Sequence, residues 1–359
     1  MTGKPARLLS IDALRGFDMF WIIGGDYLVH FTAAATGWAA LSALSHQLQH
    51  AEWAGLRLYD LVFPLFMFLS GVSAALALGD VQPERRGAII RRAGRRAAIL
   101  AGLGIIYNFG WAWEPERFRV ASVLGLIGFA YFVTVVIYCR FAGAGARFLC
   151  LLGVLAGVAT LQLGVAPPGG VAGDLTPGGS INAWIDQTFL PGRLYGGPYD
   201  PEGLLGMASG ISITLAGALC GAALRRGGVS PGVALRLGAI GTGAFLAGLF
   251  ISPVYPPIKK IWTATFDIMA IGACMVLLAT TIFLVEHKGV RAPARPFAVI
   301  GMNSIAIYMG ARFLAYPIFL WASRSAIPPA AAALIVAGVI AAEWAALAVA
   351  YRKKWFLSV

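Results

Sequence analysis

The sequence predicts an all-α protein that crosses a membrane many times, with about ten transmembrane helices (10–11) and a cytoplasmic N-terminus. Of its 359 residues, 59% are hydrophobic and only 12% are charged, and the mean hydropathy is +0.77. A soluble domain is about one quarter charged, so most of this chain is expected to lie in lipid. The apolar segments follow one another without a soluble block, which indicates a single membrane domain over residues 1–359.

Transmembrane helices need about 20 consecutive apolar residues, because the hydrocarbon layer of a bilayer is about 30 Å thick. Ten stretches of the chain approach this length and composition. The predicted spans are 14–31, 59–79, 93–110, 119–139, 147–165, 203–224, 233–251, 263–285, 296–317 and 329–350.

The net charge of +12 comes mainly from short basic clusters between the apolar stretches. Clusters that recur in alternate loops mark the cytoplasmic side of a membrane protein, which places His50 on the outer side. No aromatic residues are interleaved with these charges on a soluble face, so nucleic-acid binding is not indicated. None of the three asparagines lies in a glycosylation sequon, which favours a bacterial inner membrane. The expected inner clusters are Lys4, Arg7 and Arg15; Arg85, Arg86, Arg91, Arg92, Arg95 and Arg96; Arg140 and Arg147; Arg225, Arg226 and Arg236; Lys288, Arg291 and Arg295; and Arg352, Lys353 and Lys354.

A histidine stands where a polar loop enters an apolar helix. His50 precedes the second span, which carries Asp60 near its start, and Asp26 lies in the outer half of the first span. A neutral imidazole near a carboxylate can take a proton from an attacking amine or hydroxyl. Proton-coupled transporters also place histidine and aspartate within the membrane, so these residues alone leave a transporter of amino sugars or N-acetylglucosamine open. His46 and His50 are four apart but lack the glutamate of the zinc motif, and no metal site is predicted.

Two outer loops, 32–58 and 166–202, are expected to form the side that receives the acceptor substrate. The first has the composition of a short interfacial helix over 37–49. The second is too long for a bare connector between spans, which is typical of a lid or binding loop. In the ninth span, polar side chains spaced by four predict one stripe on one helix face; they are Ser304, Tyr308, Arg312 and Tyr316.

Several segments of the chain resemble, in the same order, the heparan-α-glucosaminide N-acetyltransferase family, including its bacterial NagX-like members. The most specific is the run from His50 through Trp53, Gly55 and Asp60 to Pro64. The others are Arg7 to Gly16, Tyr199 to Leu205, Lys260 to Thr263, and Gly301 to Ser304. The match covers nearly the whole chain.

This resemblance implies transfer of an acetyl group from cytosolic acetyl-CoA to the amine of a glucosamine on the far side of the membrane. The family's catalytic histidine matches His50, which either removes a proton from the amine or carries the acetyl group itself. Where the family has an asparagine on the first span, this chain has Asp26, and the asparagine that follows the tryptophan is here Ala54. An O-acetyltransferase acting on envelope glycans would use the same donor and stays open.

The expected partners are acetyl-CoA or CoA, an amino sugar or a short glucosamine-containing oligosaccharide, and the lipid bilayer; the resemblance makes a homodimer a reasonable assembly. The predicted site residues are His50 and Asp26 for catalysis; Trp53, Asp60, Asp200, Glu202, Lys260 and Trp262 for the sugar; and Asn303, Ser304, Tyr308, Arg312 and Arg15 for acetyl-CoA.

Overall fold

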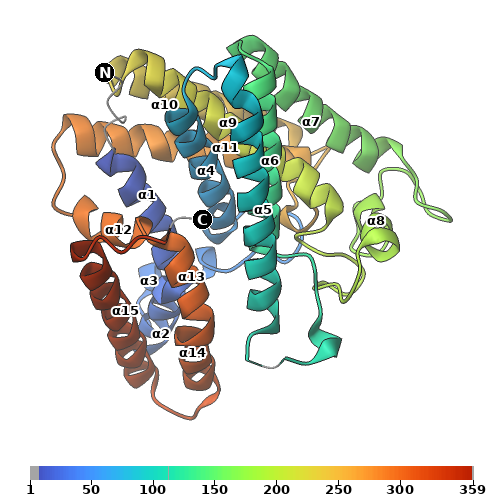
Figure 1. Ribbon diagram of the computed structural model, residues 1–359. Coiled ribbons are helices and arrows are strands. Elements are labelled where there is room, and N and C mark those ends of the chain that lie inside the picture. The colour runs from blue at the N-terminus through green and yellow to red at the C-terminus, as the bar shows by residue number, and fades with distance from the viewer. Residues whose placement is uncertain (1–7, 112, 358–359) are drawn as a thin grey trace.

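The computed structural model describes residues 8–111 and 113–357, and this part of the chain is a bundle of helices (Figure 1). Its β-type pairing is limited, among these residues, to a bridge between Arg119 and Gly192. The helices are α1 (Leu9–Phe20), α2 (Asp26–Thr36), α3 (Ala39–Gln47), α4 (Val62–Leu78), α5 (Arg86–Phe109), α6 (Val123–Arg140), α7 (Ala144–Gly164), α8 (Ile181–Phe189), α9 (Leu204–Gly227), α10 (Pro231–Ile251), α11 (Ala264–Ile282), α12 (Ala294–Gly301), α13 (Ser304–Phe313), α14 (Ala315–Arg324) and α15 (Pro329–Arg352).

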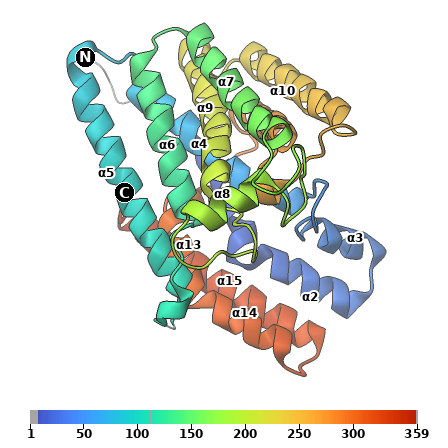
Figure 2. The ribbon, with the colours of Figure 1, turned by 90° about the vertical axis from the view of Figure 1, so that its right-hand side faces the viewer.

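The centre of the bundle is the pair α4 and α9, which packs against α6 and α11. Glycines let the two central backbones approach closely: a Cβ at Gly71 of α4 would collide with the carbonyl of Thr214, and one at Gly217 of α9 with that of Phe68. Small residues at such crossings are how helices pack in lipid, where no hydrophobic force draws apolar faces together. The short helix α8 lies against α7 and α9 (Figure 2).

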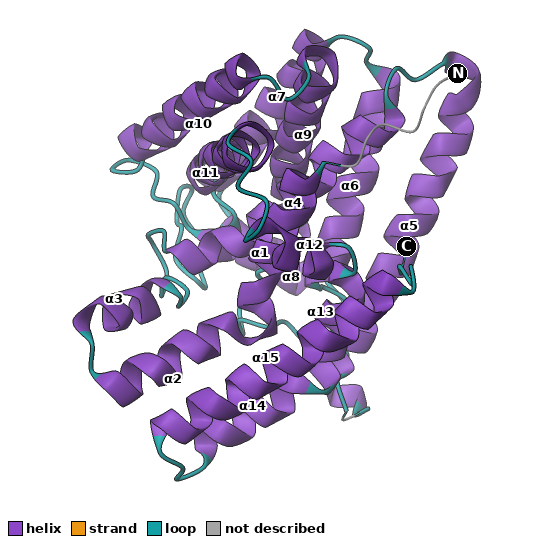
Figure 3. Ribbon diagram, turned by 90° about the vertical axis from the view of Figure 1, so that its left-hand side faces the viewer, coloured by secondary structure: helices purple, strands orange, loops and turns teal. Residues whose placement is uncertain are grey.

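A second group of helices lies beside this bundle. α2 packs against α3 and α15, and α14 against α13 and α15, while α1 and α12 pack on each other. Figure 3 shows α2, α15 and α14 side by side, apart from α10 and α11. Because α1 also contacts α4 and α11, it joins the two groups.

The expected count of ten spans is not confirmed. Among the described residues, seven helices are long and apolar enough to cross a membrane, and eight if the bent pair α13–α14 is one span. The seven agree with predicted spans that begin at 59, 119, 147, 203, 233, 263 and 329. The expected helix over 37–49 is confirmed as α3.

Two of the predicted spans are broken rather than continuous α-helices. A π-helical turn over Trp21–Gly25, with Gly24 at φ 125°, separates α1 from α2. The prediction of one helix over 296–317 is wrong, because the chain leaves helical geometry at Asn303 and bends by 44° between α13 and α14. Pro317 explains the second break, since it lacks an N–H and its ring clashes with the carbonyl four residues earlier. Tyr316 therefore belongs to α14 and not to the helix of the other stripe residues.

The starts of α4, α6, α9 and α11 gather at one end of the bundle. Arg119, just before α6, binds Glu202, just before α9, and Lys259, just before α11, lies near Asp60, just before α4. At the other end, Arg225 of α9 pairs with Asp80 beyond α4 at 3.7 Å. The basic clusters of 85–96, 140 and 225–226 thus lie opposite the end that carries His50. Lys4 and Arg7 are outside the described residues, and the cytoplasmic placement of the N-terminus remains a prediction.

Candidate active site

His50 lies in the loop after α3, and a buried carboxylate fixes its ring. Asp60 is 1% exposed, and its Oδ1 lies 2.8 Å from His50 Nδ1. Its Oδ2 accepts the backbone N–H groups of Ala51 at 3.2 Å and Arg57 at 3.0 Å. A carboxylate only accepts hydrogen bonds, so Nδ1 carries the proton and Nε2 carries the lone pair. Because α3 ends at Gln47, His46 and His50 do not share a helix face.

A lysine lies beside His50: Lys259, from the short 3₁₀ turn Lys259–Ile261. Its Nζ lies 3.0 Å from His50 Nδ1, 3.4 Å from Nε2, and 3.8 Å from Asp60 Oδ1. Burial lowers the pKa of Lys259 to about 8, against the opposing attraction of Asp60 and Glu202. Burial also lowers the pKa of His50, and the hydrogen bond to Asp60 opposes this shift. Burial therefore favours the neutral form of both groups, and Lys259 loses its proton nearer to neutral pH than a solvated lysine does.

Asp26 is linked to His50 through the side chain of a tyrosine. The Tyr59 ring lies beside the His50 ring, with centroids 4.9 Å apart, and its hydroxyl hydrogen-bonds to the Asp26 carboxylate. Asp26 Oδ1 also accepts the N–H of Tyr27 at 2.8 Å. The Tyr59 side chain thus lies between the two predicted catalytic residues. Its ring packs against His50, and its hydroxyl hydrogen-bonds to Asp26.

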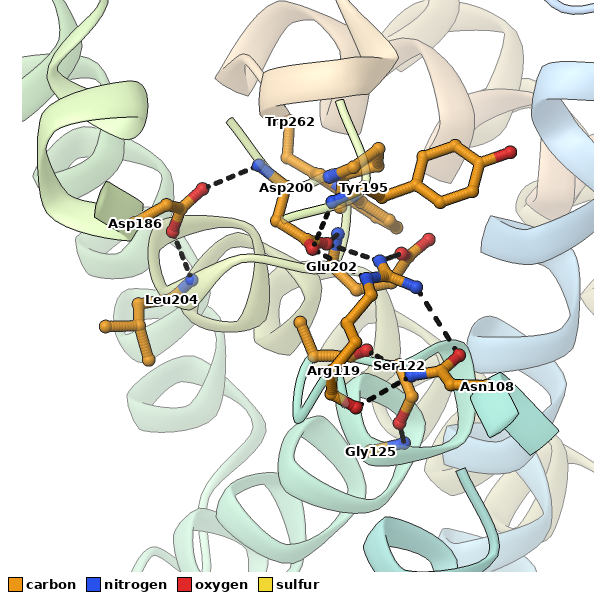
Figure 4. A network of polar contacts seen from close by, with 12 residues as sticks. Asn108, Arg119, Ser122, Gly125, Asp186, Tyr195, Asp200, Glu202, Leu204 and Trp262 are labelled. Carbon is orange, nitrogen blue, oxygen red and sulfur yellow. Dashed lines mark hydrogen bonds and ion pairs between the residues drawn. The ribbon is translucent and has the colours of Figure 1, made fainter. Parts of the chain in front are cut away.

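An arginine just before α6 is joined to the segment just before α9 (Figure 4). Arg119 binds Asp200 through Nε at 2.7 Å and through Nη2 at 2.5 Å, and the same Nη2 donates to Glu202. Asp186 of α8 in turn accepts the N–H groups of Asp200 and Leu204, both at 3.0 Å. Burial raises the pKa of Glu202, while Arg119 opposes that shift. The long outer loop is therefore locked onto the start of α6.

Two adjoining cavities meet at His50. The inner one has a volume of ≈ 200 Å³ and is mainly apolar, with Met19, Phe63 and Ile127 in its wall. The outer one has ≈ 720 Å³ and is more polar, with Arg193 and Tyr195 in its wall. The residues that line both are His50, Tyr107, Val123, Glu202, Lys259 and Tyr308. A base at such a junction can act between two substrates that enter separately.

The other predicted acetyl-CoA residues divide between these cavities and the rest of the bundle. Ser304 and Tyr308 line the inner cavity, and Tyr308 and Arg312 line the outer one. Asn303 lies elsewhere: its amide donates to the carbonyl of Trp355 and accepts the N–H of Leu357. The Arg15 guanidinium donates to the Ser73 hydroxyl at 2.6 Å and lines neither cavity.

Among the predicted sugar-binding residues, the two tryptophans hold the outer loops together. Trp262 is 1% exposed, and its indole N–H donates to the carbonyl of Pro201 at 2.7 Å. The Trp53 indole donates to the carbonyl of Leu175 at 3.0 Å. Neither lines the cavities, whereas Asp60, Glu202 and Lys260 line the outer one. Asp200 lies behind Arg119 with its side chain fully buried.

Two residues that were not predicted from the sequence, Lys259 and Arg119, also belong to the site. The sequence pointed to Lys260 for the sugar, yet it is Lys259 that contacts His50. Arg119 had been placed in a span, although α6 begins only at Val123, after the Ser122 hydroxyl has capped it. An arginine at the edge of an apolar run needs carboxylates nearby, and that signal could have identified Arg119.

The chain has relatives among curated proteins, although no protein-family model matches it. It is 26% identical to human heparan-alpha-glucosaminide N-acetyltransferase over 372 residues, which cover 86% of this chain and 53% of the human protein. It is 25% identical to the mouse protein of that name over 414 residues, which cover 98% of this chain and 60% of the mouse protein. Along most of its length, the chain is thus similar to two heparan-alpha-glucosaminide N-acetyltransferases.

This similarity accords with the bundle of long apolar helices. This chain spans little more than half the length of the human and mouse proteins. The similarity extends along most of its own sequence, so the His50 loop, the Arg119 network and Lys259 all fall within a domain related to these two acetyltransferases.

Proposed function

We propose that this chain is a transmembrane acetyltransferase that moves an acetyl group from cytosolic acetyl-CoA to the amine of a glucosamine-type sugar on the periplasmic side of a bacterial inner membrane. The observation that carries the proposal is the His50–Asp60 pair at the junction of the two cavities. The relationship to two N-acetyltransferases supports the reaction class.

His50 supplies the base that the chemistry needs. Its Nε2 removes a proton from the sugar amine while the amine nitrogen attacks the thioester carbonyl carbon. The carbon–sulfur bond then breaks, and the imidazolium returns the proton to the departing thiolate. Asp60, hydrogen-bonded at Nδ1, stabilises the imidazolium between these two steps. Direct transfer in this way requires no group covalently bound to the enzyme.

The two cavities suit the two substrates. The narrow apolar cavity fits the acetyl-pantetheine arm, with Ser304 and Tyr308 in its wall, while the larger polar cavity fits a sugar with its hydroxyl groups. Glu202 lines both and can accept a hydrogen bond from the sugar amine before the reaction. Of the two arginines predicted to bind acetyl-CoA, Arg312 lines the larger cavity and Arg15 lines neither, so neither arginine lines the cavity that fits the acetyl-pantetheine arm.

Acetyl transfer by the purified protein tests the proposal. We expect acetyl-CoA to raise the melting temperature of the protein in detergent, because a ligand that binds only the folded state stabilises it. With glucosamine or a glucosamine disaccharide added, mass spectrometry should detect an N-acetylated sugar together with free CoA. His50→Ala should abolish transfer, and His46→Ala, which changes an exposed histidine of α3, should not.

The other outcomes identify the alternatives. An acetyl ester in place of an amide would indicate an O-acetyltransferase, whose attacking group is a hydroxyl. Sugar uptake into proteoliposomes that follows a proton gradient, without any need for acetyl-CoA, would indicate a transporter. Full transfer by His50→Ala would remove His50 from the mechanism.

A further inference from the structure

The attack of an amine on a thioester pushes electrons onto the carbonyl oxygen, so the site needs a donor where that negative charge forms. Removing such a donor typically costs about 10²–10³-fold in kcat. The donor must lie close to Nε2 of the base, because the attacking nitrogen and the carbonyl oxygen are bonded to the same carbon. This inference rests on the proposed acetyl transfer.

Two of the predicted site residues, Asn303 and Asp26, do not supply this donor. The Asn303 amide is engaged by Trp355 and Leu357. Asp26 is a carboxylate that would repel the developing charge, and Tyr59, which separates it from His50, directs its hydroxyl to that carboxylate. The need for a donor therefore falls on another group at the junction of the cavities.

Lys259 has the required position. Its Nζ lies 3.4 Å from His50 Nε2 and lines both cavities. Lys259 Nζ also lies 3.0 Å from His50 Nδ1. Lys259 cannot donate a hydrogen bond to Nδ1, because Nδ1 carries the proton that it donates to Asp60. The Asp60 oxygen nearest to Lys259 is 3.8 Å away, beyond hydrogen-bond distance. One N–H of the ammonium can donate to the Nε2 lone pair at 3.4 Å; an ammonium has three N–H groups, so among the described residues others are left for a ligand.

We propose that Lys259 is a catalytic residue that donates a hydrogen bond to the thioester carbonyl oxygen and stabilises the oxyanion formed as the amine attacks. The carbonyl π electrons move to this oxygen as the carbon–nitrogen bond forms. They return when the carbon–sulfur bond breaks, and the proton held by His50 passes to the thiolate. Lys259 keeps its own protons throughout and supplies charge only.

The charged groups around Lys259 fit this role. Asp60 on the turn before α4 and Glu202 before α9 attract its proton, Lys260 on the same turn repels it, and His50 faces it from the loop after α3. With carboxylates on two sides and partial burial, the ammonium stays charged at neutral pH but loses its proton in mildly alkaline solution, since its pKa is about 8. If Lys259 is catalytic, kcat should therefore depend on pH in mildly alkaline solution.

The test compares Lys259→Met, Lys259→Arg and Lys260→Met for kcat and KM. We expect Lys259→Met to lower kcat about 10²–10³-fold, with a smaller change in KM. Lys259→Arg should retain much of the activity, because guanidinium also donates charged hydrogen bonds. Lys260→Met removes the neighbouring ammonium, whose Nζ donates to the Glu52 carbonyl at 2.5 Å; it should act on KM and not reproduce the loss of kcat.

The pH profile separates catalysis from a structural role. The wild type should lose kcat in alkaline solution as Lys259 loses its proton, and Lys259→Arg should keep its kcat there, because guanidinium stays protonated. An alkaline limb unchanged in Lys259→Arg would overturn the proposal, as would a wild-type kcat in Lys259→Met. A thermal shift with acetyl-CoA shows that each variant is folded. If the wild type itself transfers no acetyl group, the proposed function fails, a result distinct from failure of the Lys259 role.

Discussion

Replacing Asp60 by asparagine exchanges one oxygen for an NH₂ group in the side chain that orients His50. In the wild type, Oδ1 faces His50 Nδ1, and Oδ2 accepts the N–H groups of Ala51 and Arg57. An asparagine whose oxygen takes the Oδ2 position keeps both backbone bonds and turns its NH₂ group toward the ring. Nδ1 must then accept, so the proton moves to Nε2, and the nitrogen that faces the substrate is no longer a base.

The size of the effect follows from this geometry. One charge-assisted hydrogen bond, worth about 1.5–3 kcal/mol, becomes a neutral one worth about 0.5–1.5 kcal/mol, so the free energy of unfolding should fall by about 1–2 kcal/mol. The rate should fall much further, because the wrong tautomer in a histidine–carboxylate pair lowers kcat by about 10⁴-fold. We therefore expect Asp60→Asn to be folded and nearly inactive.

The assay is the rate of CoA release in the presence of an amino sugar, measured beside the thermal unfolding of the same sample. Asp60→Ala is the comparison, because it also leaves the Ala51 and Arg57 N–H groups without an acceptor and should cost about 2–6 kcal/mol of stability. Wild-type kcat in a folded Asp60→Asn protein would refute the reasoning, since it would show that the tautomer of His50 does not matter.

Other substitutions test further parts of the structure. Asn303→Ala should leave the affinity for acetyl-CoA unchanged but expose the C-terminal segment to trypsin; weaker acetyl-CoA binding, measured by calorimetry, would instead restore Asn303 to the donor site. Burial raises the pKa of Asp186 from its ordinary 3.8 to about 6, so the folded protein keeps a proton that the unfolded chain releases. Stability should therefore decrease as the pH rises from about 4 to about 6, and Asp186→Asn should flatten this part of a melting-temperature profile. Arg119→Lys replaces a two-point contact with Asp200 by a point charge and should lower stability by about 3 kcal/mol; an unchanged melting temperature would show that the network adds nothing.

The long apolar runs made much of the fold predictable. Lipid cannot pair with backbone N–H and C=O groups, so a run such as 203–224 has to be helical, and α9 is found there. Interruptions were harder to foresee. The predicted span over 14–31 assumed an unbroken helix, but a π-helical turn precedes Asp26.

The candidate site was predictable as chemistry and less so as geometry. His50 and Asp60 are ten residues apart, and the structure places them in hydrogen-bond contact. Lys259 and Lys260 are identical residues that are adjacent in the sequence. Only the path of the 3₁₀ turn decides which of the two ammonium groups faces His50. Trp262 looked like an exposed platform for a sugar, yet it is buried with φ at 51°, between Phe63 and Phe266.

The gathering of helix starts around His50 has a consequence for how the protein is made. A membrane protein is inserted from its N-terminus as the ribosome extends the chain. His50 and Asp60 leave the ribosome early, whereas Arg119, Glu202 and Lys259 follow in that order, each just ahead of the helix that carries it. The junction of the two cavities is therefore complete only after α13, which carries Tyr308, has followed α11 out of the ribosome. A nascent chain shorter than this holds the base and its carboxylate but lacks one wall of the site, so the bundle acquires its reactive centre late in synthesis.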